Sequence, residues 1–151
     1  VSWGIWNVIQ LQPGGRVLIP VPEGTGLWEH RDWSILDDWT RKGDVLVLNH
    51  TGKEGKVHTI GPEGWVAYEK DGEVFVLTFP ADPNAAYPAE HGNCEVYAGG
   101  AYVELEHVAP LVTLAPGETS MTSERWFVFS LGRAALSDIE LAARIREMLL
   151  L

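Results

Sequence analysis

The sequence predicts an all-β fold, a β-sandwich that carries one helix at its C-terminal end. Seven tryptophans and sixteen glycines among 151 residues are both high counts, and this composition favours many short strands joined by tight turns. Short apolar runs separated by turns that contain Gly or Pro recur along the chain, whereas helical spacing occurs only near the C-terminus. The length suits a single core, so we expect residues 1–151 to form one domain.

The first half of the chain is expected to supply paired strands. Residues 3–11 alternate in character and lead through Gln-Pro-Gly-Gly into the apolar run 16–21, which predicts a hairpin. A second hairpin is expected where Asp71-Gly72 joins residues 65–70 to 73–79, because Asp-Gly is a strong turn signal. Residues 44–48 form a further buried-strand pattern. Between these runs, residues 22–42 hold Trp28, Trp33 and Trp39 without alternation, and we expect an excursion with a short helical turn that packs onto the sandwich. The alternative for these three rings is that they line a cleft.

The second half begins with a long loop and ends with the helix. Residues 80–93 are rich in Pro and Ala, and loops of this length often border functional clefts. Strands are expected at residues 94–98, 101–107, 111–114 and 119–131. Ser137 followed by Glu140 forms a capping box, which starts a helix. Its apolar stripe consists of Leu141, Ile145, Met148 and Leu149, so we expect this helix to pack on the sandwich.

Charge and composition narrow the classes of partner. The net charge is −10 with only eleven Lys and Arg, and no basic run occurs, so a nucleic acid is not expected to bind. No apolar run is long enough for a membrane-spanning helix. The single cysteine, Cys94, cannot form an intrachain disulfide, which suits a reducing compartment. We therefore expect a soluble, cytoplasmic protein.

A hairpin around Gly99-Gly100 is expected to bring two carboxylates together. Its symmetry places Glu95 opposite Glu104 and Tyr97 opposite Tyr102. Opposed Cβ atoms lie about 5 Å apart, and like charges there are destabilising, so the pair needs a compensating cation, a shared proton or a ligand.

The other face of this hairpin is a core stripe made of Cys94, Val96, Ala98, Ala101, Val103 and Leu105. We therefore expect the carboxylate face to lie outside the core. Paired carboxylates suit general acid–base catalysis. A solvated polar face with splayed side chains is the simpler alternative, and spacing alone favours it.

Four side chains on other segments could complete a site beside the carboxylates. Lys56 and His58 share one face of residues 56–60 and could supply a cation and a proton-transfer group, although both types are often plain surface residues. Trp6 and Gln10 share one face of the first strand, where they offer a ring for stacking and an amide for hydroxyls. A tryptophan that belongs to the core is the alternative for Trp6.

The remaining histidines give no sign of a metal site. His50, His91 and His107 do not form a spacing such as His-x-x-x-His, which metal-binding helices use. The sequence therefore leads us to expect no essential metal and no other cofactor.

Three motifs in the second half resemble a known family. They read Gly-Ala-Tyr-Val-Glu at residues 100–104, Leu-Ala-Pro-Gly-Glu at 114–118 and Arg-Trp-Phe-Val-Phe at 125–129. This pattern is similar to the C-terminal end of galactose mutarotases (aldose epimerases), which carries Gly-x-x-Leu-Glu, Leu-x-Pro-Gly-Glu and Trp-Phe-x-Phe. Residues 3–11 also resemble the family strand that bears His-x-Tyr-Phe. Where the family has His-x-Tyr-Phe, this chain reads Val8-Ile9-Gln10-Leu11. The strand is similar to that of a mutarotase-like branch that carries Trp-x-x-Trp-x-x-x-Gln.

The resemblance implies part of a galactose mutarotase-like sandwich that acts on or binds a carbohydrate. It makes Glu104 the catalytic base and leaves the acid role, filled by His in the family, without its usual residue. Glu95 would modulate the base, while Trp6, Gln10, Lys56, His58 and Tyr97 would hold the sugar in an acidic cleft. Two alternatives stay open, a non-catalytic carbohydrate-binding module and an interaction domain without ligand.

The resemblance also bears on assembly. Family members carry an N-terminal half that completes a large double-sheet sandwich, and this chain has no counterpart to it. Because bare sheet edges invite pairing, we expect a homodimer or association with a separate N-terminal half.

Overall fold

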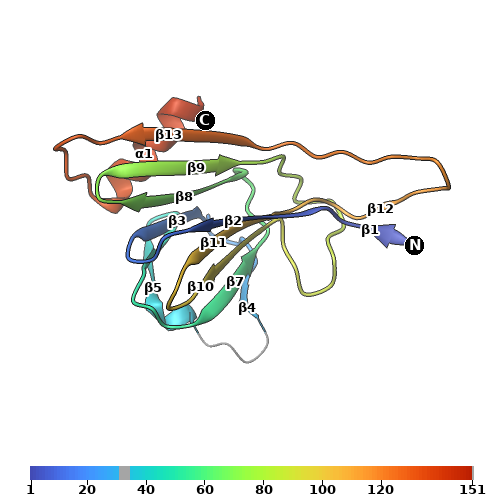
Figure 1. The fold of residues 1–151 in the computed structure, drawn as a ribbon, viewed down its shortest axis with the longest axis horizontal. Coiled ribbons are helices and arrows are strands. Elements are labelled where there is room, and N and C mark those ends of the chain that lie inside the picture. The colour runs from blue at the N-terminus through green and yellow to red at the C-terminus, as the bar shows by residue number, and fades with distance from the viewer. Residues whose placement is uncertain (31–34, 151) are drawn as a thin grey trace.

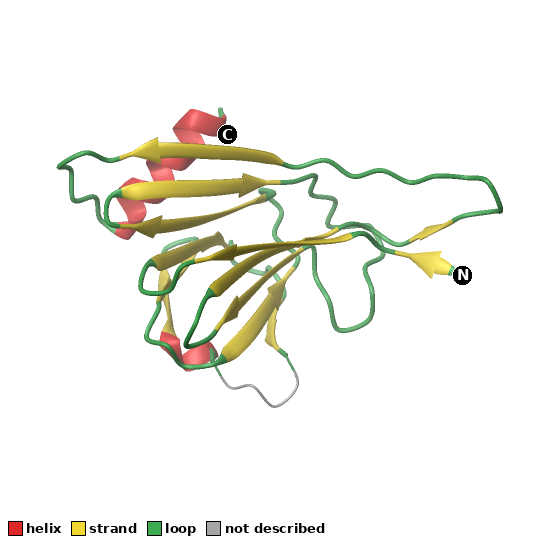
Figure 2. Cartoon of the chain, in the orientation of Figure 1, coloured by secondary structure: helices red, strands yellow, loops and turns green. Residues whose placement is uncertain are grey.

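The computed structural model describes residues 1–30 and 35–150 and contains three antiparallel sheets and one α-helix (Figures 1 and 2). The five-stranded sheet runs, from edge to edge, β2 (Trp6–Leu11), β11 (Val103–Val108), β10 (Cys94–Ala98), β7 (Gly55–Thr59) and β4 (Leu27–Glu29). The six-stranded sheet runs β13 (Arg125–Ser130), β9 (Glu73–Thr78), β8 (Trp65–Lys70), β3 (Arg16–Pro20), β6 (Val45–Asn49) and β5 (Trp39–Lys42). A small sheet pairs β1 (Ser2–Trp3) with β12 (Val112–Thr113). The predicted all-β sandwich with a C-terminal helix is confirmed.

The two larger sheets pack face to face around the main core. Val57, Val96 and Leu105 from the five-stranded sheet form one buried cluster with side chains of the six-stranded sheet such as Val17 and Leu77. The predicted core stripe on β10 and β11 is therefore confirmed, except that Ala101 is exposed because it lies in the turn between them. The opposite face of the five-stranded sheet points away from this core.

The helix α1 (Asp138–Leu149) covers the other face of the six-stranded sheet. Leu141 and Ile145 are fully buried and pack with Trp65 and Val76 in a second core cluster. The predicted capping box is present, since the Ser137 side chain accepts a hydrogen bond from the backbone N–H of Glu140 and Glu140 bonds back to Ser137. The structure therefore confirms both the predicted start of the helix and its buried stripe.

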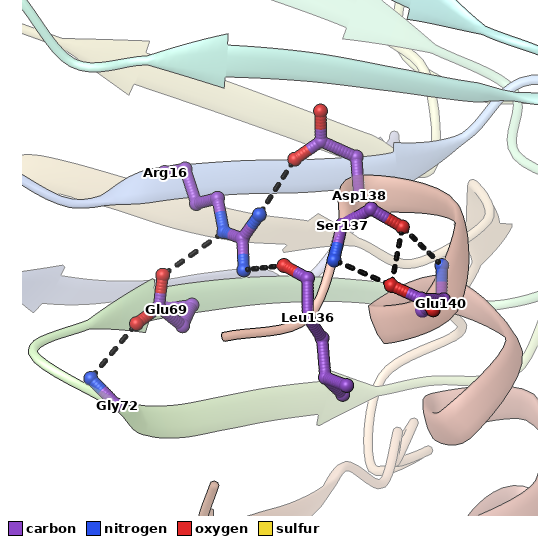
Figure 3. A network of polar contacts seen from close by, with 7 residues as sticks. All are labelled: Arg16, Glu69, Gly72, Leu136, Ser137, Asp138 and Glu140. Carbon is purple, nitrogen blue, oxygen red and sulfur yellow. Dashed lines mark hydrogen bonds and ion pairs between the residues drawn. The ribbon is translucent and has the colours of Figure 1, made fainter. Parts of the chain in front are cut away.

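Arg16 ties the start of α1 to the six-stranded sheet (Figure 3). Its guanidinium contacts Glu69 on β8 at 2.9 Å and Asp138 at 2.7 Å, and donates to the carbonyl oxygen of Leu136 at 3.0 Å. Three acceptors from β8, the connecting segment and the helix thus converge on one cation. This network holds the helix N-terminus against strands β3 and β8.

Several predicted pairings differ from the structure. Residues 3–11 and 16–21 do not form a hairpin, because β2 belongs to the five-stranded sheet and β3 to the six-stranded sheet. The turn between them crosses from one sheet to the other and is held there by Tyr68, whose hydroxyl accepts the backbone N–H of Gly15 and donates to the carbonyl of Gln12. The hairpin of β8 and β9 through Asp71-Gly72 is confirmed, with positive φ at both turn residues.

The expected excursion at residues 22–42 contains more structure than the sequence indicates. It holds β4, the predicted short helical turn η1 (Leu36–Asp38) and β5. Trp39 is buried in the main core, whereas Trp33 lies outside the described residues.

The last predicted strand is also shorter than expected. Only Arg125–Ser130 of residues 119–131 is extended in a sheet, and residues 114–124 project from the sandwich as a long loop (Figure 1). Trp126 on this edge strand is exposed.

The described part of the chain contains no helix that is long and apolar enough to cross a membrane.

Candidate functional site

The outer face of the five-stranded sheet gathers most of the residues that the sequence singles out. Strand register sets one row of directly opposed residues across the sheet, Trp28, His58, Glu95, Glu106 and Val8. A neighbouring row consists of Lys56, Tyr97, Glu104 and Gln10. Alternation of side chains puts both rows on the face opposite the apolar core. Segments far apart in the sequence therefore meet at one polar surface.

The predicted register of the β10–β11 hairpin is wrong by two residues. Glu95 lies opposite Glu106 rather than Glu104, and Tyr97 lies opposite Glu104 rather than Tyr102. The turn comprises residues 99–102 and is closed by a hydrogen bond from the N–H of Gly99 to the carbonyl of Tyr102. Because a shift of two residues preserves the face, two carboxylates still oppose each other, with Glu106 as the partner.

The carboxylate face lies opposite the apolar core, as expected, but two of its carboxylates are not solvated. Glu95 and Glu106 are both 0% exposed. Lys56 lies between them, with its ammonium 2.7 Å from Glu95 Oε2 and 2.7 Å from Glu106 Oε2. This ammonium is the compensating cation that the predicted carboxylate pair requires, and burial of the pair depends on it.

Three histidines extend the cluster on the side of Glu95. The Nδ1 atoms of His58 and His91 lie 3.1 Å and 2.6 Å from the same oxygen, Oε1 of Glu95. His30 Nδ1 lies 3.1 Å from His58 Nε2, and the indole of Trp28 stacks on the His58 ring at 6.0 Å between centroids. The predicted position of His58 beside the carboxylates is thus observed, and its ring is held from two sides.

The pKa of Glu95 is lowered and that of Glu106 is raised. Burial acts to raise the pKa of Glu95, but hydrogen bonds from His58 and Lys56 outweigh it and lower the pKa to about 2. For Glu106 burial prevails, and the nearby Glu95 charge adds to it, so its pKa is raised despite the bond from Lys56. The pKa of Lys56 is raised because both carboxylates outweigh its own desolvation.

Trp6 covers the cluster from the solvent side. Its indole N–H donates to Glu106 Oε2 at 2.6 Å, and the Lys56 ammonium lies 4.8 Å from the centroid of its ring. The side chain is 55% exposed, so Trp6 is not part of the apolar core. The Trp6 ring therefore forms a partly exposed aromatic surface directly above buried charges.

Glu104, Gln10 and Tyr97 lie beside the buried cluster in a more open row. Gln10 Nε2 donates to Glu104 Oε1 at 2.8 Å, and the Tyr97 hydroxyl donates to Glu54 at 2.9 Å. Gln10 and Glu104 thus share the predicted face, but Glu104 pairs with an amide rather than with Glu95. Several surface hollows lie along the six-stranded sheet, beside α1 or near β5. On the acidic face, Glu95 and Glu106 are covered by other side chains.

Sequence reasoning missed three members of the cluster. His91 comes from the loop 80–93, which was expected to border a site, and it precedes Glu95 by four residues. Glu106 follows Glu104 by two residues, so alternation along the strand already puts it on the same face. His30 follows the short strand β4, and no pattern in the sequence indicated that strand.

The fold and this cluster define a β-sandwich protein with a buried carboxylate pair, a bridging lysine and histidines on one sheet face. The chain belongs to the family described as Domain of unknown function (DUF4380), whose model matches residues 1–129. The match includes every strand of the five-stranded sheet and ends within β13, before α1. No curated protein and no solved structure matches this chain.

Proposed function

We propose that this chain binds a sugar or a sugar-like polyol on the outer face of the five-stranded sheet and transfers protons there, in the manner of an aldose epimerase. The observation that carries the proposal is the buried pair of Glu95 and Glu106 joined by Lys56, with the pKa values of the carboxyls pushed apart. Two carboxyl groups with split pKa values are the arrangement that divides acid and base roles within one site.

The geometry favours Glu106 as the group that exchanges a proton. The pKa of Glu106 is raised towards neutral pH, as a general acid or base requires. Its Oε1 atom is buried without a hydrogen-bond partner among the described residues, while Oε2 accepts from Trp6 and Lys56. The mutarotase-like motif instead assigns the base to Glu104.

Glu95 then serves as a fixed anion. Its low pKa keeps it ionised, and it accepts contacts from Lys56, His58 and His91. A permanent negative charge there orients the ammonium and both imidazoles, which are the groups able to donate protons to a sugar oxygen. His58 or His91 would act as the general acid, because the first strand carries no histidine and offers only Gln10 for that role.

Trp6 and His91 form the layer that a sugar meets first. Both side chains are partly exposed, and their rings lie 6.4 Å apart between centroids. An indole face stacks on the apolar face of a pyranose, while Gln10 and Glu104 supply hydrogen bonds to its hydroxyls. Because Glu106 has no exposed surface, proton transfer requires the bound sugar to displace Trp6 from above Lys56.

The test is an NMR screen with a panel of aldoses that records chemical-shift changes and the rate of anomer interconversion. Glu106→Gln should abolish interconversion while binding survives, because an amide keeps the shape and loses the exchangeable carboxyl proton. Glu104→Gln is the matched comparison in the neighbouring row and should mainly weaken binding. Loss of interconversion only in Glu104→Gln would return the base role to Glu104, and the absence of any binding would contradict the proposal.

A non-catalytic carbohydrate-binding module is the second candidate, and complete burial of both carboxylates favours it. In that case the Lys56 bridge is structural, and Trp6, Gln10 and Glu104 bind the ligand at the surface. Saturable sugar binding without interconversion in the parent protein would establish this candidate over the first.

A further inference from the structure

We propose that His58, His91 and Glu95 bind one divalent transition-metal ion of the zinc type. The inference goes beyond the sugar site because it concerns a different ligand and requires no sugar to be present, and in the metal-bound form His58 and His91 act as ligands rather than as proton donors. It rests on the position of two imidazole nitrogens around one carboxylate oxygen, a juxtaposition that the sequence spacing did not suggest.

The donor atoms already lie close to a coordinating arrangement. One ligand atom from each of the three residues lies within 4.8 Å of the others. His58 Nδ1 and His91 Nδ1 both approach Glu95 Oε1, at 3.1 Å and 2.6 Å. Tetrahedral bonds of about 2.0–2.2 Å to zinc put neighbouring donor atoms about 3.3–3.6 Å apart, so His58 lies near that separation from Glu95 and His91 must move back by up to about 1 Å. Small side-chain rotations would therefore admit an ion at the centre of the three atoms.

The donor types select the class of ion. Imidazole nitrogens suit Zn²⁺, Cu²⁺, Ni²⁺ and Fe²⁺, whereas Ca²⁺ and Mg²⁺ take oxygen ligands almost throughout. Two histidines and one carboxylate also leave a coordination position open for water or for an oxygen of another molecule, as catalytic zinc sites do. The site is thus of the open kind rather than a closed structural one.

Neighbouring groups hold the proposed ligands in place. His58 is fixed by His30 at its other nitrogen, Nε2, and by the stacked ring of Trp28, and such outer contacts orient metal-binding imidazoles. His91 is positioned by its backbone N–H, which donates to the carbonyl of Pro88 at 3.0 Å. Its side chain is 30% exposed, which gives an ion a route from solvent to two ligands that are fully buried.

Lys56 shares Glu95 with the proposed ion without blocking it. The ammonium contacts Glu95 Oε2, whereas both imidazoles face Oε1. Lys56 also contacts Glu106, so the carboxylate pair supplies two negative charges for the ammonium and the ion together. The positive charge of Lys56 will weaken metal affinity in comparison with an uncharged neighbour, which makes a measured binding constant necessary.

The experiment is a titration of the full chain with Co²⁺, followed by its visible d–d absorption, and competition by Zn²⁺ in sugar-free buffer. We expect one saturable site, displaced stoichiometrically by Zn²⁺. His91→Ala should weaken binding roughly tenfold or more, and this partly exposed loop residue can be replaced without emptying the core. His50→Ala, which removes a histidine outside the cluster, should bind as the parent does.

Two results would overturn the metal site. One is a Co²⁺ spectrum that shows no saturable component, and the other is equal affinity in the parent and in His91→Ala while circular dichroism shows both to be folded. Because no sugar is present, either result leaves the sugar-binding proposal intact, and failure of the NMR screen leaves the metal site intact.

Discussion

Lys56 is the residue on which the charge balance of the carboxylate face depends. It contacts both buried carboxylates through one ammonium group and is itself nearly buried. A buried ion pair adds little net stability compared with apolar packing, but removal of one partner leaves an uncompensated charge in a poorly solvated position. The cluster is therefore sensitive to loss of its single lysine.

Replacement of that lysine gives the first prediction. Lys56→Met should lower the free energy of unfolding by about 3–5 kcal/mol at neutral pH, because Glu95 and Glu106 lose their shared cation. Lys53→Met is the control, since Lys53 forms an ion pair with Asp38 at the surface, and such pairs contribute about 0–1 kcal/mol. Urea denaturation of both variants measures the difference. Equal effects would contradict the structural role of the ammonium.

The two carboxyls should titrate on opposite sides of their ordinary pKa. Glu95 is expected near a pKa of about 2 and Glu106 above the ordinary 4.5, as read from side-chain ¹³C shifts during an NMR titration. Because the folded pKa of Glu95 is lowered, its contribution to stability is present above about 4.5 and is lost as pH falls towards 2. The raised pKa of Glu106 has the reverse sign, so its contribution is lost as pH rises. Two identical titrations near 4.5 would refute the split.

At the scale of single elements, the β10–β11 hairpin shows what the sequence can and cannot predict. Alternation from Cys94 to Ala98 correctly assigned the core face and the polar face, because a two-residue period determines which side chains share a side. The register was wrong because the turn of residues 99–102 is centred on Gly100-Ala101, one residue beyond the predicted centre at Gly99-Gly100, and the bond between Gly99 and Tyr102 closes it there.

Burial of the cluster lies beyond the reach of any local pattern. Trp6, Lys56 and His91 come from three separate segments, and only the tertiary fold brings them over Glu95 and Glu106. The sequence suggested Lys56 and His58 as neighbours of the carboxylates because they share one strand face. It did not suggest His91 or His30, because only the tertiary fold brings them to the cluster.

The loop that carries His91 depends on a close backbone contact at Gly92. A Cβ atom on Gly92 would lie 2.0 Å from the carbonyl oxygen of Thr59 on β7. Gly92→Ala should therefore push the loop off β7, displace His91 and cost about 1–3 kcal/mol. Gly100→Ala is the control, because its Cβ would meet nothing closer than 3.9 Å. Thermal unfolding and the His91 ring NMR signals report the two effects, and an unshifted His91 signal would contradict the prediction.

The helix α1 is expected to stabilise the fold through its buried stripe. Leu141→Ala should lower the free energy of unfolding by about 2–5 kcal/mol, since the side chain is fully buried against the six-stranded sheet. Ile139→Ala on the exposed side of the same helix should change it by less than about 0.5 kcal/mol. Denaturation followed by tryptophan fluorescence compares them. Similar losses in both variants would mean that α1 does not pack as described.

At the scale of the whole molecule, both larger sheets end, among the described residues, in strands that are hydrogen-bonded to a neighbouring strand on one side only. On β13 the side chains of Trp126 and Val128 are exposed, Val128 at 71%, and β2 at the edge of the other sheet exposes Trp6 and Val8. Exposed apolar edge strands favour pairing with another chain. The homodimer expected from the sequence thus stays a prediction that these edges support.

Sedimentation velocity over a range of protein concentrations tests this assembly. We expect a concentration-dependent rise in mass for the parent chain and a shift towards the monomer for Val128→Lys, because a charged residue on an edge strand opposes pairing. Met121→Lys, in the projecting loop, should associate as the parent does. A parent chain that remains monomeric at every concentration would contradict the homodimer.

The placement of α1 has a practical consequence for handling the protein. The helix α1 lies over the outer face of the six-stranded sheet (Figure 1), whereas the carboxylate cluster lies on the outer face of the other sheet. Two sheet layers therefore stand between α1 and the cluster. A C-terminal tether to a sensor chip or resin would turn Trp6 and its neighbours outward, towards the flowing analyte, without crowding them.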